Sequence, residues 1–382
     1  MTREEVNNLA LSEIDKTKYL ILELITGYGK TKVAIDLINH ICDRVFRNDE
    51  SSATILILVA KTVHKQTWKD EIEKWGGINS DCITIECYES FKNYENSYFD
   101  IVVADEMQHL SETRLKVLES IHIHEAFIGL SATIKRDMRD YFIHNHKAEV
   151  IKCGLKEAVE DEVLPEPTVY LLPLSLDVKS YTYKFEKVNR FGRSIVTTQK
   201  GYYDRISSLI KWYKNKYSDS GNRRMKNLWL SMAGKRLKWC AEQKEALVLS
   251  LLDKFRNYKT LTFCSGIEQS ERLGKYNITS KNKASVKNLE MFNSNKIKHI
   301  TACNILNEGV NLTNCRIGIF CNLNSSEIVV KQRVGRILRH KSPIIIIPYF
   351  KDTREEELVE KMIEEYSKDS IITIDNVNDI KL

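Results

Sequence analysis

The sequence lacks the features that mark membrane-spanning, zinc-binding and secreted proteins. No apolar run approaches the roughly 20 residues that a helix needs to cross a bilayer. None of the nine cysteines forms the Cys-x-x-Cys pair that zinc sites usually need. Residues 1–5 are charged and lack the apolar core of a signal peptide. We therefore expect a cytoplasmic protein without membrane contact, whose cysteines serve as small apolar core residues.

Prolines are also scarce, and the chain outside one segment carries no net positive charge. Two of the five prolines, Pro165 and Pro167, follow an acidic stretch and predict a linker. The net charge is +6, but segment 179–259 alone holds 20 basic and 6 acidic residues, a balance of +14. The rest of the chain holds 38 basic and 46 acidic residues, a balance of −8. This concentration favours a surface that follows a nucleic-acid backbone, with a solvated helix face as the alternative.

Apolar runs alternate with helical patterns on both sides of the basic segment. Strands are predicted at 19–25, 53–60, 82–87, 99–104 and 126–130, and again at 260–264, 299–303, 317–321 and 344–347. Segment 179–259 is predicted to be mostly helical, with a turn at 218–222. Near-continuous apolar strands between helices indicate parallel sheets covered on both faces. The predicted fold class is α/β, with two parallel-sheet domains in tandem and a mostly helical basic insertion between them.

A glycine-containing loop joins the first predicted strand to the helix after it. Its residues are Thr26, Gly27, Tyr28, Gly29, Lys30 and Thr31. Gly27 and Gly29 allow backbone N–H groups to turn toward phosphate oxygens, and the helix N-terminus points to the same place. Lys30 can reach the outer phosphates, and the Thr31 hydroxyl can ligate magnesium. The alternative is a strand–turn–helix connection that uses glycine for its geometry alone.

Two carboxylates close a later apolar strand. Asp105 and Glu106 follow directly after the predicted strand 99–104. Open parallel sheets bind ligands at the carboxyl ends of their strands, where these side chains should lie. Asp105 can hold a magnesium ion, and Glu106 can orient and deprotonate an attacking water molecule. Beside the glycine loop, this pair favours nucleoside triphosphate hydrolysis over a solvated strand end.

The third motif is an arginine-rich string at 332–339, which reads Gln-Arg-Val-Gly-Arg-Ile-Leu-Arg. Arg336 and Arg339 are three residues apart, so a helix would present both on one face. Their guanidinium forks suit a phosphoryl group that gains charge in the transition state. Alone, the string would fit a basic helix face. With the other two motifs it completes a site that can hydrolyse a nucleoside triphosphate.

In their order along the chain, these motifs resemble those of superfamily 2 helicases and translocases. The strings TGYGKT, DEMQH, GLSAT, NEGVN and QRVGRILR correspond to motifs I, II, III, V and VI. Residues 60–68 resemble motif Ia, 88–91 motif Ib and 263–265 motif IV. Gln108 stands in the fourth position of motif II, which departs from the DEAH pattern. Within the superfamily, the chain resembles most the phage recombination helicases and the motor subunits of restriction enzymes.

The resemblance implies two RecA-like domains, 1–164 with motifs I, Ia, II and III, and 165–382 with motifs IV, V and VI and the insertion at about 179–259. It implies ATP and Mg²⁺ as cofactors. The catalytic residues that it implies are Lys30, Glu106, Gln332, Arg336 and Arg339. The implied ATP-binding residues are Thr26, Gly27, Tyr28, Gly29, Lys30, Thr31, Gly309 and Asn311. The implied magnesium ligands are Thr31 and Asp105. Nucleic-acid contacts are expected at Lys61, Thr62, Ser131 and Thr133, to which the basic segment adds Arg223, Arg224 and Lys226.

The predicted function is an ATP-dependent nucleic-acid motor: a DNA helicase, a branch-remodelling enzyme or a duplex translocase. An RNA helicase is an alternative, because contacts to the backbone dominate binding in such proteins and carry no sequence signal. A nucleic-acid-gated ATPase switch without processive unwinding is a second alternative. DNA is favoured over RNA as the partner. We expect a monomeric motor with replication or recombination proteins as partners, located in the host cytoplasm if a phage encodes it.

Overall fold

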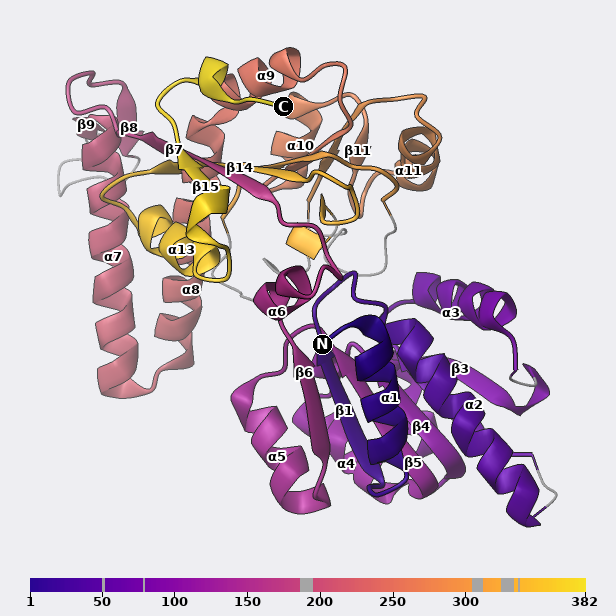
Figure 1. Ribbon diagram of the computed structural model, residues 1–382. Helices are drawn as coiled ribbons and strands as arrows, with labels where there is room; N and C mark the ends of the chain where they lie inside the picture. The colour runs from indigo at the N-terminus through magenta and orange to yellow at the C-terminus, as the bar shows by residue number, and fades with distance from the viewer. Residues whose placement is uncertain (50–51, 78–79, 186–194, 304–311, 324–332, 336) are drawn as a thin grey trace. The chain divides into compact units, whose positions relative to one another are not determined.

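The computed structural model describes residues 1–49, 52–77, 80–185, 195–303, 312–323, 333–335 and 337–382. The chain divides into two compact units, and Figure 1 shows the elements of each. The first unit contains Met1–Glu166 and the described residues of Ser326–Lys341. The second contains the described residues of Pro167–Ile305, Leu312–Ser325 and Ser342–Leu382. Each unit has its own parallel sheet.

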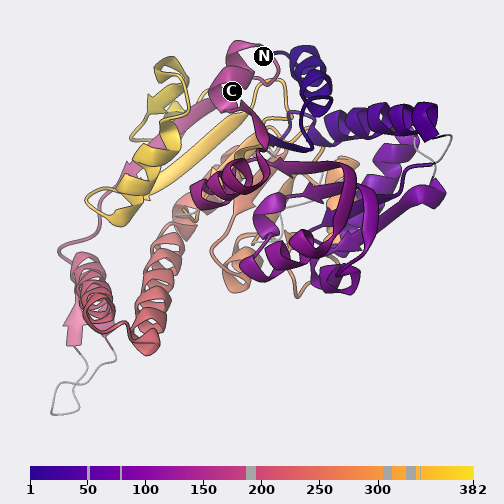
Figure 2. The ribbon, with the colours of Figure 1, turned by 90° about the horizontal axis from the view of Figure 1, so that it is seen from below.

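The sheet of the first unit has six parallel strands in the order β3-β2-β4-β5-β1-β6. The strands are β1 (Tyr19–Leu24), β2 (Ile55–Val59), β3 (Ile83–Cys87), β4 (Tyr98–Asp105), β5 (His122–Ser131) and β6 (Glu149–Cys153). The joining helices are α1 (Arg3–Ile14), α2 (Lys30–Asp49), α3 (Thr62–Trp75), the 3₁₀ segment η2 (Tyr88–Tyr94), α4 (Glu112–Ser120), α5 (Arg136–His146) and α6 (Leu155–Glu160). Helices α1 and α2 cover one face of the sheet, and α4 and α5 cover the other (Figures 1 and 2). Because all strands run the same way, the carboxyl ends of β1, β4 and β5 meet at one edge.

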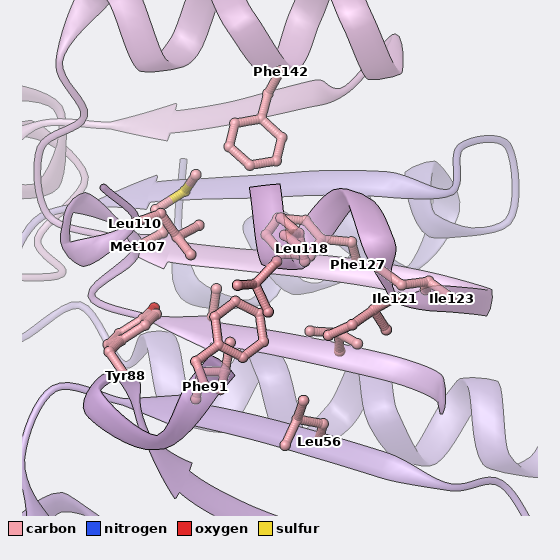
Figure 3. Close-up of a cluster of buried hydrophobic side chains, with 14 of the residues drawn as sticks. Leu56, Tyr88, Phe91, Met107, Leu110, Leu118, Ile121, Ile123, Phe127 and Phe142 are labelled. Atoms are coloured by element: carbon pink, nitrogen blue, oxygen red, sulfur yellow. The ribbon is translucent and has the colours of Figure 1, made fainter. Parts of the chain in front are cut away.

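The core of the first unit anchors the residues that follow β4. Figure 3 shows the side chains that fill one side of the sheet, with Phe127 of β5 next to Phe142 of α5. The centroids of these two rings lie 5.2 Å apart, and the rings are stacked. Met107, directly after Glu106, is fully buried in the same cluster. A well-packed neighbour thus fixes the backbone that carries Glu106.

The sheet of the second unit has seven parallel strands in the order β11-β12-β10-β13-β14-β7-β15. The strands are β7 (Thr168–Leu174), β10 (Thr260–Phe263), β11 (Asn277–Ile278), β12 (His299–Ala302), β13 (Ile317–Phe320), β14 (Ile344–Phe350) and β15 (Ile371–Thr373). The helices around it are α9 (Glu245–Lys254), α10 (Ile267–Leu273), α11 (Ser285–Asn293) and α13 (Arg354–Ile363). Val248 and Leu251 of α9 pack with Ile317 and Ile344 of the sheet in one buried cluster. This helix therefore belongs to the core of the unit.

The basic insertion is a long helical hairpin inside the second unit. Helices α7 (Gln199–Ser220) and α8 (Arg223–Gln243) run side by side and extend beyond the sheet of this unit (Figures 1 and 2). Gly221 ends α7 with a positive φ of 63°, a conformation that favours glycine. The Asn222 side chain then accepts a hydrogen bond from the Arg224 N–H and caps α8. The expected turn at 218–222 is confirmed.

Part of the insertion is not helical. Its first part contains the antiparallel strands β8 (Tyr183–Phe185) and β9 (Ile195–Thr197), within a segment predicted to be mostly helical. The insertion begins after β7, which pairs with β14 in the second sheet, so it lies within the second unit. Short strands with few apolar residues carry too weak a pattern to be recognised from sequence.

The predicted fold class is confirmed by the two parallel sheets. The predicted strands are all present, but β6, β7, β11 and β15 were not expected. β6 lies at the sheet edge, and only two of its five residues are buried, which explains its weak pattern. Seven of the nine cysteines are buried, and all nine are free, as expected for core residues. In the described part of the chain, no helix is long and apolar enough to span a bilayer.

Candidate nucleotide and nucleic-acid sites

The glycine loop has the backbone conformation that a phosphate cradle needs. Gly27 and Gly29 have φ angles of +94° and +110°, which side chains rarely allow. The loop follows β1, and α2 begins at Lys30, so the helix N-terminus opens onto the loop. The hydroxyl of Thr26 is buried and has no hydrogen-bond partner among the described residues. A phosphate group in the loop would give this hydroxyl a partner, so the loop fits the triphosphate of ATP.

The two side chains that flank Gly29 point to different places. The Lys30 ammonium group donates a hydrogen bond to the main-chain oxygen of Leu24 at 3.0 Å, across the base of the loop. Tyr28, in contrast, is fully buried, and its hydroxyl lies within hydrogen-bond distance of the main-chain oxygens of Met1 and Thr2. The Tyr28 side chain is therefore directed away from the loop, and only the main chain of this residue could contact a phosphate.

Arg3 supports the loop from helix α1, and the sequence gave no signal for this role. Its guanidinium group donates to the main-chain oxygen of Tyr28 at 3.0 Å and to that of Val163 at 3.3 Å. These bonds tie the glycine loop to the segment that follows α6. A side chain that bonds only main-chain oxygens leaves no recognisable spacing in a sequence.

Asp105 ends β4 in a position where its charge is poorly solvated. Burial raises the pKa of Asp105 to about 6, and the neighbouring charge of Glu106 adds to this effect. The hydrogen bond from Trp68 and the charge of Lys30 act in the opposite direction. A carboxylate with raised pKa near a phosphate loop is the kind of group that a divalent cation stabilises.

Two aromatic side chains hold Asp105 in place. The indole nitrogen of Trp68 donates to the Asp105 carboxylate at 2.9 Å, and the Tyr88 hydroxyl donates to the Asp105 main-chain oxygen at 3.0 Å. Trp68 and Tyr88 are 1% and 2% exposed. Trp68 lies on α3, whose N-cap is Lys61, and Tyr88 begins η2. The sequence placed both near motifs Ia and Ib but gave no sign of these bonds.

Glu106 is linked to the end of β5 by a chain of hydrogen bonds through Gln108. The Gln108 amide donates to the Glu106 carboxylate at 2.7 Å. The Ser131 hydroxyl donates to the Gln108 side-chain oxygen at 2.6 Å and also lies 2.8 Å from the main-chain oxygen of Thr133. Glu106 itself has a φ of +52°, a strained conformation for a residue other than glycine. Gln108, which departs from the DEAH pattern, is therefore the connection between motifs II and III.

The donor set around Asp105 fits magnesium. Mg²⁺ in nucleotide sites is usually held by one or two protein oxygens together with phosphates and water. The Thr31 hydroxyl and the Asp105 carboxylate supply such a pair, and both line one pocket of about 380 Å³. Among the described residues, no group of three or more His, Cys, Asp or Glu side chains could hold a metal without a nucleotide.

That pocket gathers most of the described candidate site residues. It is lined by Thr26, Lys30, Thr31, Trp68, Asp105 and Glu106, among others. Arg339, which is exposed, also lines it from the segment that groups with the first unit. A second cavity of about 690 Å³ adjoins the loop at Gly27 and includes Arg3 and Pro165. Gly309, Asn311, Gln332 and Arg336 lie outside the described residues.

The expected nucleic-acid contacts fall into two groups. Lys61 and Thr62 are exposed at the start of α3, and Arg223, Arg224 and Lys226 are exposed at the start of α8. Ser131 and Thr133 are only 0% and 9% exposed, so the prediction that they contact nucleic acid is revised. Their hydrogen bonds assign them to the connection with Gln108 instead.

A comparison with known families finds a match for one part of the chain. Residues 242–341 match the family described as Helicase conserved C-terminal domain. The match begins near the end of α8, so α7 and nearly all of α8 precede it. The hairpin is thus an addition to the matched domain.

One characterised relative and several solved structures are similar over most of the chain. The relative is the "DNA 3'-5' translocase XPB2" of Sulfurisphaera tokodaii, 22% identical, with 85% of this chain and 76% of the relative covered. A putative HsdR subunit of a type I restriction enzyme from Vibrio vulnificus has a TM-score of 0.61 and 19% identity, with 97% of this chain and 68% of that one covered. The Saccharomyces cerevisiae protein Dbp5, solved with RNA and ADP BeF3, has a TM-score of 0.56 and 11% identity, with 94% and 85% covered. The structures extend the similarity to both units. The chain has the fold of these solved structures, and its residues 242–341 match the Helicase conserved C-terminal domain family.

Proposed function

We propose that the chain is an ATP-dependent DNA motor, a helicase or duplex translocase that couples ATP hydrolysis to movement along DNA. The observation that carries this proposal is the hydrogen-bonded path from Glu106 through Gln108 to Ser131, which joins the proposed water-activating carboxylate to the end of a neighbouring strand. A motor needs such a connection, because a change at the phosphate must be passed to another part of the chain.

The residues divide the chemistry among them in a definite way. The glycine loop and Lys30 hold the phosphates, and Thr31 and Asp105 would hold magnesium, which would neutralise charge on the transferred phosphoryl group. Glu106 accepts a proton from the attacking water, and Gln108 orients its carboxylate. Gly309 and Asn311 contribute to nucleotide binding, and Arg336 and Arg339 stabilise the transition state with Gln332 in the same network. The catalytic site then needs the residues of motif VI in addition to those of motifs I and II.

DNA is the proposed track, with Lys61, Thr62 and the start of α8 as contacts. The similar S. tokodaii protein is named as a DNA translocase, and the basic hairpin adds positive charge that suits a phosphate backbone. The biological role, the oligomeric state and the location are proposed from the resemblance to phage recombination helicases and to the motor subunits of restriction enzymes. We propose a role in recombination or branch remodelling, action as a monomer with replication or recombination proteins, and a cytoplasmic location.

ATP hydrolysis measured with different nucleic acids tests the proposal. Single-stranded DNA, duplex DNA, forked DNA and RNA of equal length should be compared at one salt concentration, beside a strand-displacement and a translocation assay. We expect DNA to stimulate hydrolysis more than RNA does, and ATP to drive displacement or translocation. Stimulation by RNA alone would assign an RNA helicase. Stimulation by DNA without displacement or translocation would assign a nucleic-acid-gated switch.

A pair of lysine variants ties the activity to the glycine loop. Lys30→Ala should abolish hydrolysis with every nucleic acid, because it removes the phosphate contact. Lys116→Ala is the control, since Lys116 is exposed on α4 and does not line the pocket that contains Lys30. Equal activity in both variants would show that the hydrolysis comes from a contaminating enzyme or another site.

A further inference from the structure

The outer part of the α7–α8 hairpin has no hydrophobic core of its own. Not one side chain between 211 and 238 is buried, although this stretch contains two tryptophans, two tyrosines and three leucines. The buried aromatic residues of the hairpin, Tyr203 and Trp239, pack at its base with Leu176 and Phe350. Partly exposed apolar side chains on a projecting hairpin call for a partner.

The aromatic residues of this outer part have different surroundings. Trp229 is half-buried, and its ring stacks on Tyr217 at 6.2 Å between the two helices. Lys214 lies over Trp229 and Lys226 over Tyr217, each at 5.7 Å. Trp212 is 51% exposed, and its ring makes a T-shaped contact with that of Tyr213 at 4.9 Å. Trp229 and Tyr217 therefore hold the hairpin together, whereas half of the Trp212 side chain is open to solvent.

Positive charge surrounds Trp212. Residues 211–238 hold nine basic side chains and one acidic side chain, Asp219. Arg205 and Lys216 are seven residues before and four residues after Trp212, so all three share one face of α7. Among the described residues, no carboxylate pairs with Lys211 or Lys216. An exposed indole between unpaired lysines suits a ligand that combines flat aromatic faces with negative charge.

We propose that Trp212, flanked by Lys211 and Lys216, is a base-stacking platform for single-stranded nucleic acid. The platform deepens the proposed function, because a motor that separates or tracks strands must hold unpaired bases. Single-stranded nucleic acid offers an unpaired base to stack on the indole and phosphates to meet the lysines. A duplex cannot offer the first, since its bases are stacked on one another. A second copy of this hairpin would bring two strongly basic surfaces together, and repulsion opposes that pairing.

Tryptophan fluorescence of the full chain tests the platform. The protein should be titrated with oligo(dT) and with a duplex of equal length at one salt concentration, in the absence of nucleotide. We expect oligo(dT) to quench the emission and the duplex to quench it much less. Trp212→Phe should remove the part of the signal that oligo(dT) quenches. Trp229→Phe is the matched control on the facing helix and should keep that quenching.

Binding measured by a labelled oligonucleotide separates stacking from structural effects. Trp212→Ala should weaken oligo(dT) binding roughly ten-fold, as expected when one base loses its aromatic partner. Trp212→Phe should keep most of the affinity, because phenylalanine also stacks. Duplex binding and the salt dependence of binding should stay unchanged, since no phosphate contact is lost. Because Trp212 is half exposed, the thermal unfolding of both variants should match the parent.

Three results would overturn the platform. Wild-type affinity of Trp212→Ala for oligo(dT) would place base stacking elsewhere, and equal losses for oligo(dT) and duplex would assign Trp212 a structural role. Capture of an acidic protein with no effect on oligo(dT) would also overturn it. Failure of the platform can be told apart from failure of the proposed motor function. If the chain is not a motor, DNA will not stimulate ATP hydrolysis in the parent protein or in Trp212→Ala.

Discussion

The indole nitrogen of Trp68 donates a 2.9 Å hydrogen bond to the carboxylate of Asp105. Trp68 is buried on α3, seven residues after the exposed Lys61 that caps the same helix. The proposed magnesium ligand is thus bonded directly to a helix that begins at a proposed nucleic-acid contact. A movement of α3 on binding nucleic acid would change the orientation of the Asp105 carboxylate.

Replacing Trp68 with phenylalanine should weaken magnesium-dependent nucleotide binding. Trp68→Phe keeps an aromatic ring in the core but removes the hydrogen bond, and loss of such an outer partner typically costs roughly ten-fold or more in metal affinity. The measurement is binding of a fluorescent ADP analogue as a function of Mg²⁺ concentration. Trp229→Phe is the control, because Trp229 stacks on Tyr217 in the α7–α8 hairpin and does not line the pocket that contains Asp105. If both variants need the same Mg²⁺ concentration, the Trp68 bond plays no part in metal binding.

Asp105 should lower the stability of the metal-free protein at neutral pH. Its pKa is raised to about 6 in the folded chain, above its ordinary value near 3.8, so ionisation favours the unfolded state as pH rises through that interval. Asp105→Asn should therefore raise the unfolding temperature at pH 7 to 8, and its free energy of unfolding should exceed that of the parent by roughly 3 kcal/mol. The gain should disappear below about pH 4, where both residues are neutral.

The same experiment contains its own check for magnesium. Unfolding temperatures should be measured with and without Mg²⁺ and ADP. Adding both should raise the unfolding temperature of the parent protein and raise that of Asp105→Asn much less, because the variant lacks the ionised ligand. A variant that is less stable than the parent at pH 8 without metal would contradict the raised pKa of Asp105.

Gln108 should be needed for fast hydrolysis but not for nucleotide binding. Gln108→Leu removes the hydrogen bond to Glu106 and the one from Ser131, and a bond to a charged group contributes about 1.5–3 kcal/mol. We expect a roughly ten- to hundred-fold fall in DNA-stimulated turnover, with nucleotide affinity kept within about two-fold. Gln66→Leu removes an exposed bond to Asp70 on α3 and should have no effect. Normal turnover in Gln108→Leu would mean that the path from motif II to motif III is not used.

Sequence reasoning recovered the parts of the site that have fixed spacing along the chain. The glycine loop and Asp105 stand at the ends of apolar strands, and such strands are recognised because each contains a run of at least four consecutive buried residues. Gln108 was noticed only as a departure from a motif, since its two bonds reach Glu106 and a strand 23 residues later. Trp68 and Arg3 were missed because their partners are 37 residues away or are main-chain oxygens. Ser131 was assigned to nucleic acid because a motif does not state how deeply its residues are buried.

The start of α8 should contribute charge to nucleic-acid binding. Arg223, Arg224 and Lys226 are exposed close to the tip of the hairpin. Replacing all three with alanine should raise the DNA concentration needed for half-maximal ATP hydrolysis and leave the maximal rate nearly intact. Each lost phosphate contact should lower the slope of log affinity against log salt by roughly 0.7 to 0.9. Lys156→Ala, which removes an exposed lysine paired with Glu160 in the first unit, is the control. An unchanged slope in the triple variant would move the contacts to the surface around Lys61.

The last prediction concerns Arg336, which motif VI alone assigns to catalysis. Arg336→Ala should lower DNA-stimulated turnover roughly 10³-fold or more, because the transition state of phosphoryl transfer gains charge that the guanidinium group stabilises. Arg336→Lys should restore only part of this loss, since an ammonium group keeps the charge but lacks the planar fork. Lys341→Ala, at an exposed position five residues later, should hydrolyse ATP normally. The rates should be measured at saturating DNA and ATP, so that a weaker affinity for either is not mistaken for a catalytic defect. A normal rate in Arg336→Ala would show that the catalytic site does not need motif VI, and Lys30, Asp105 and Glu106 would then have to catalyse hydrolysis without an arginine from this string.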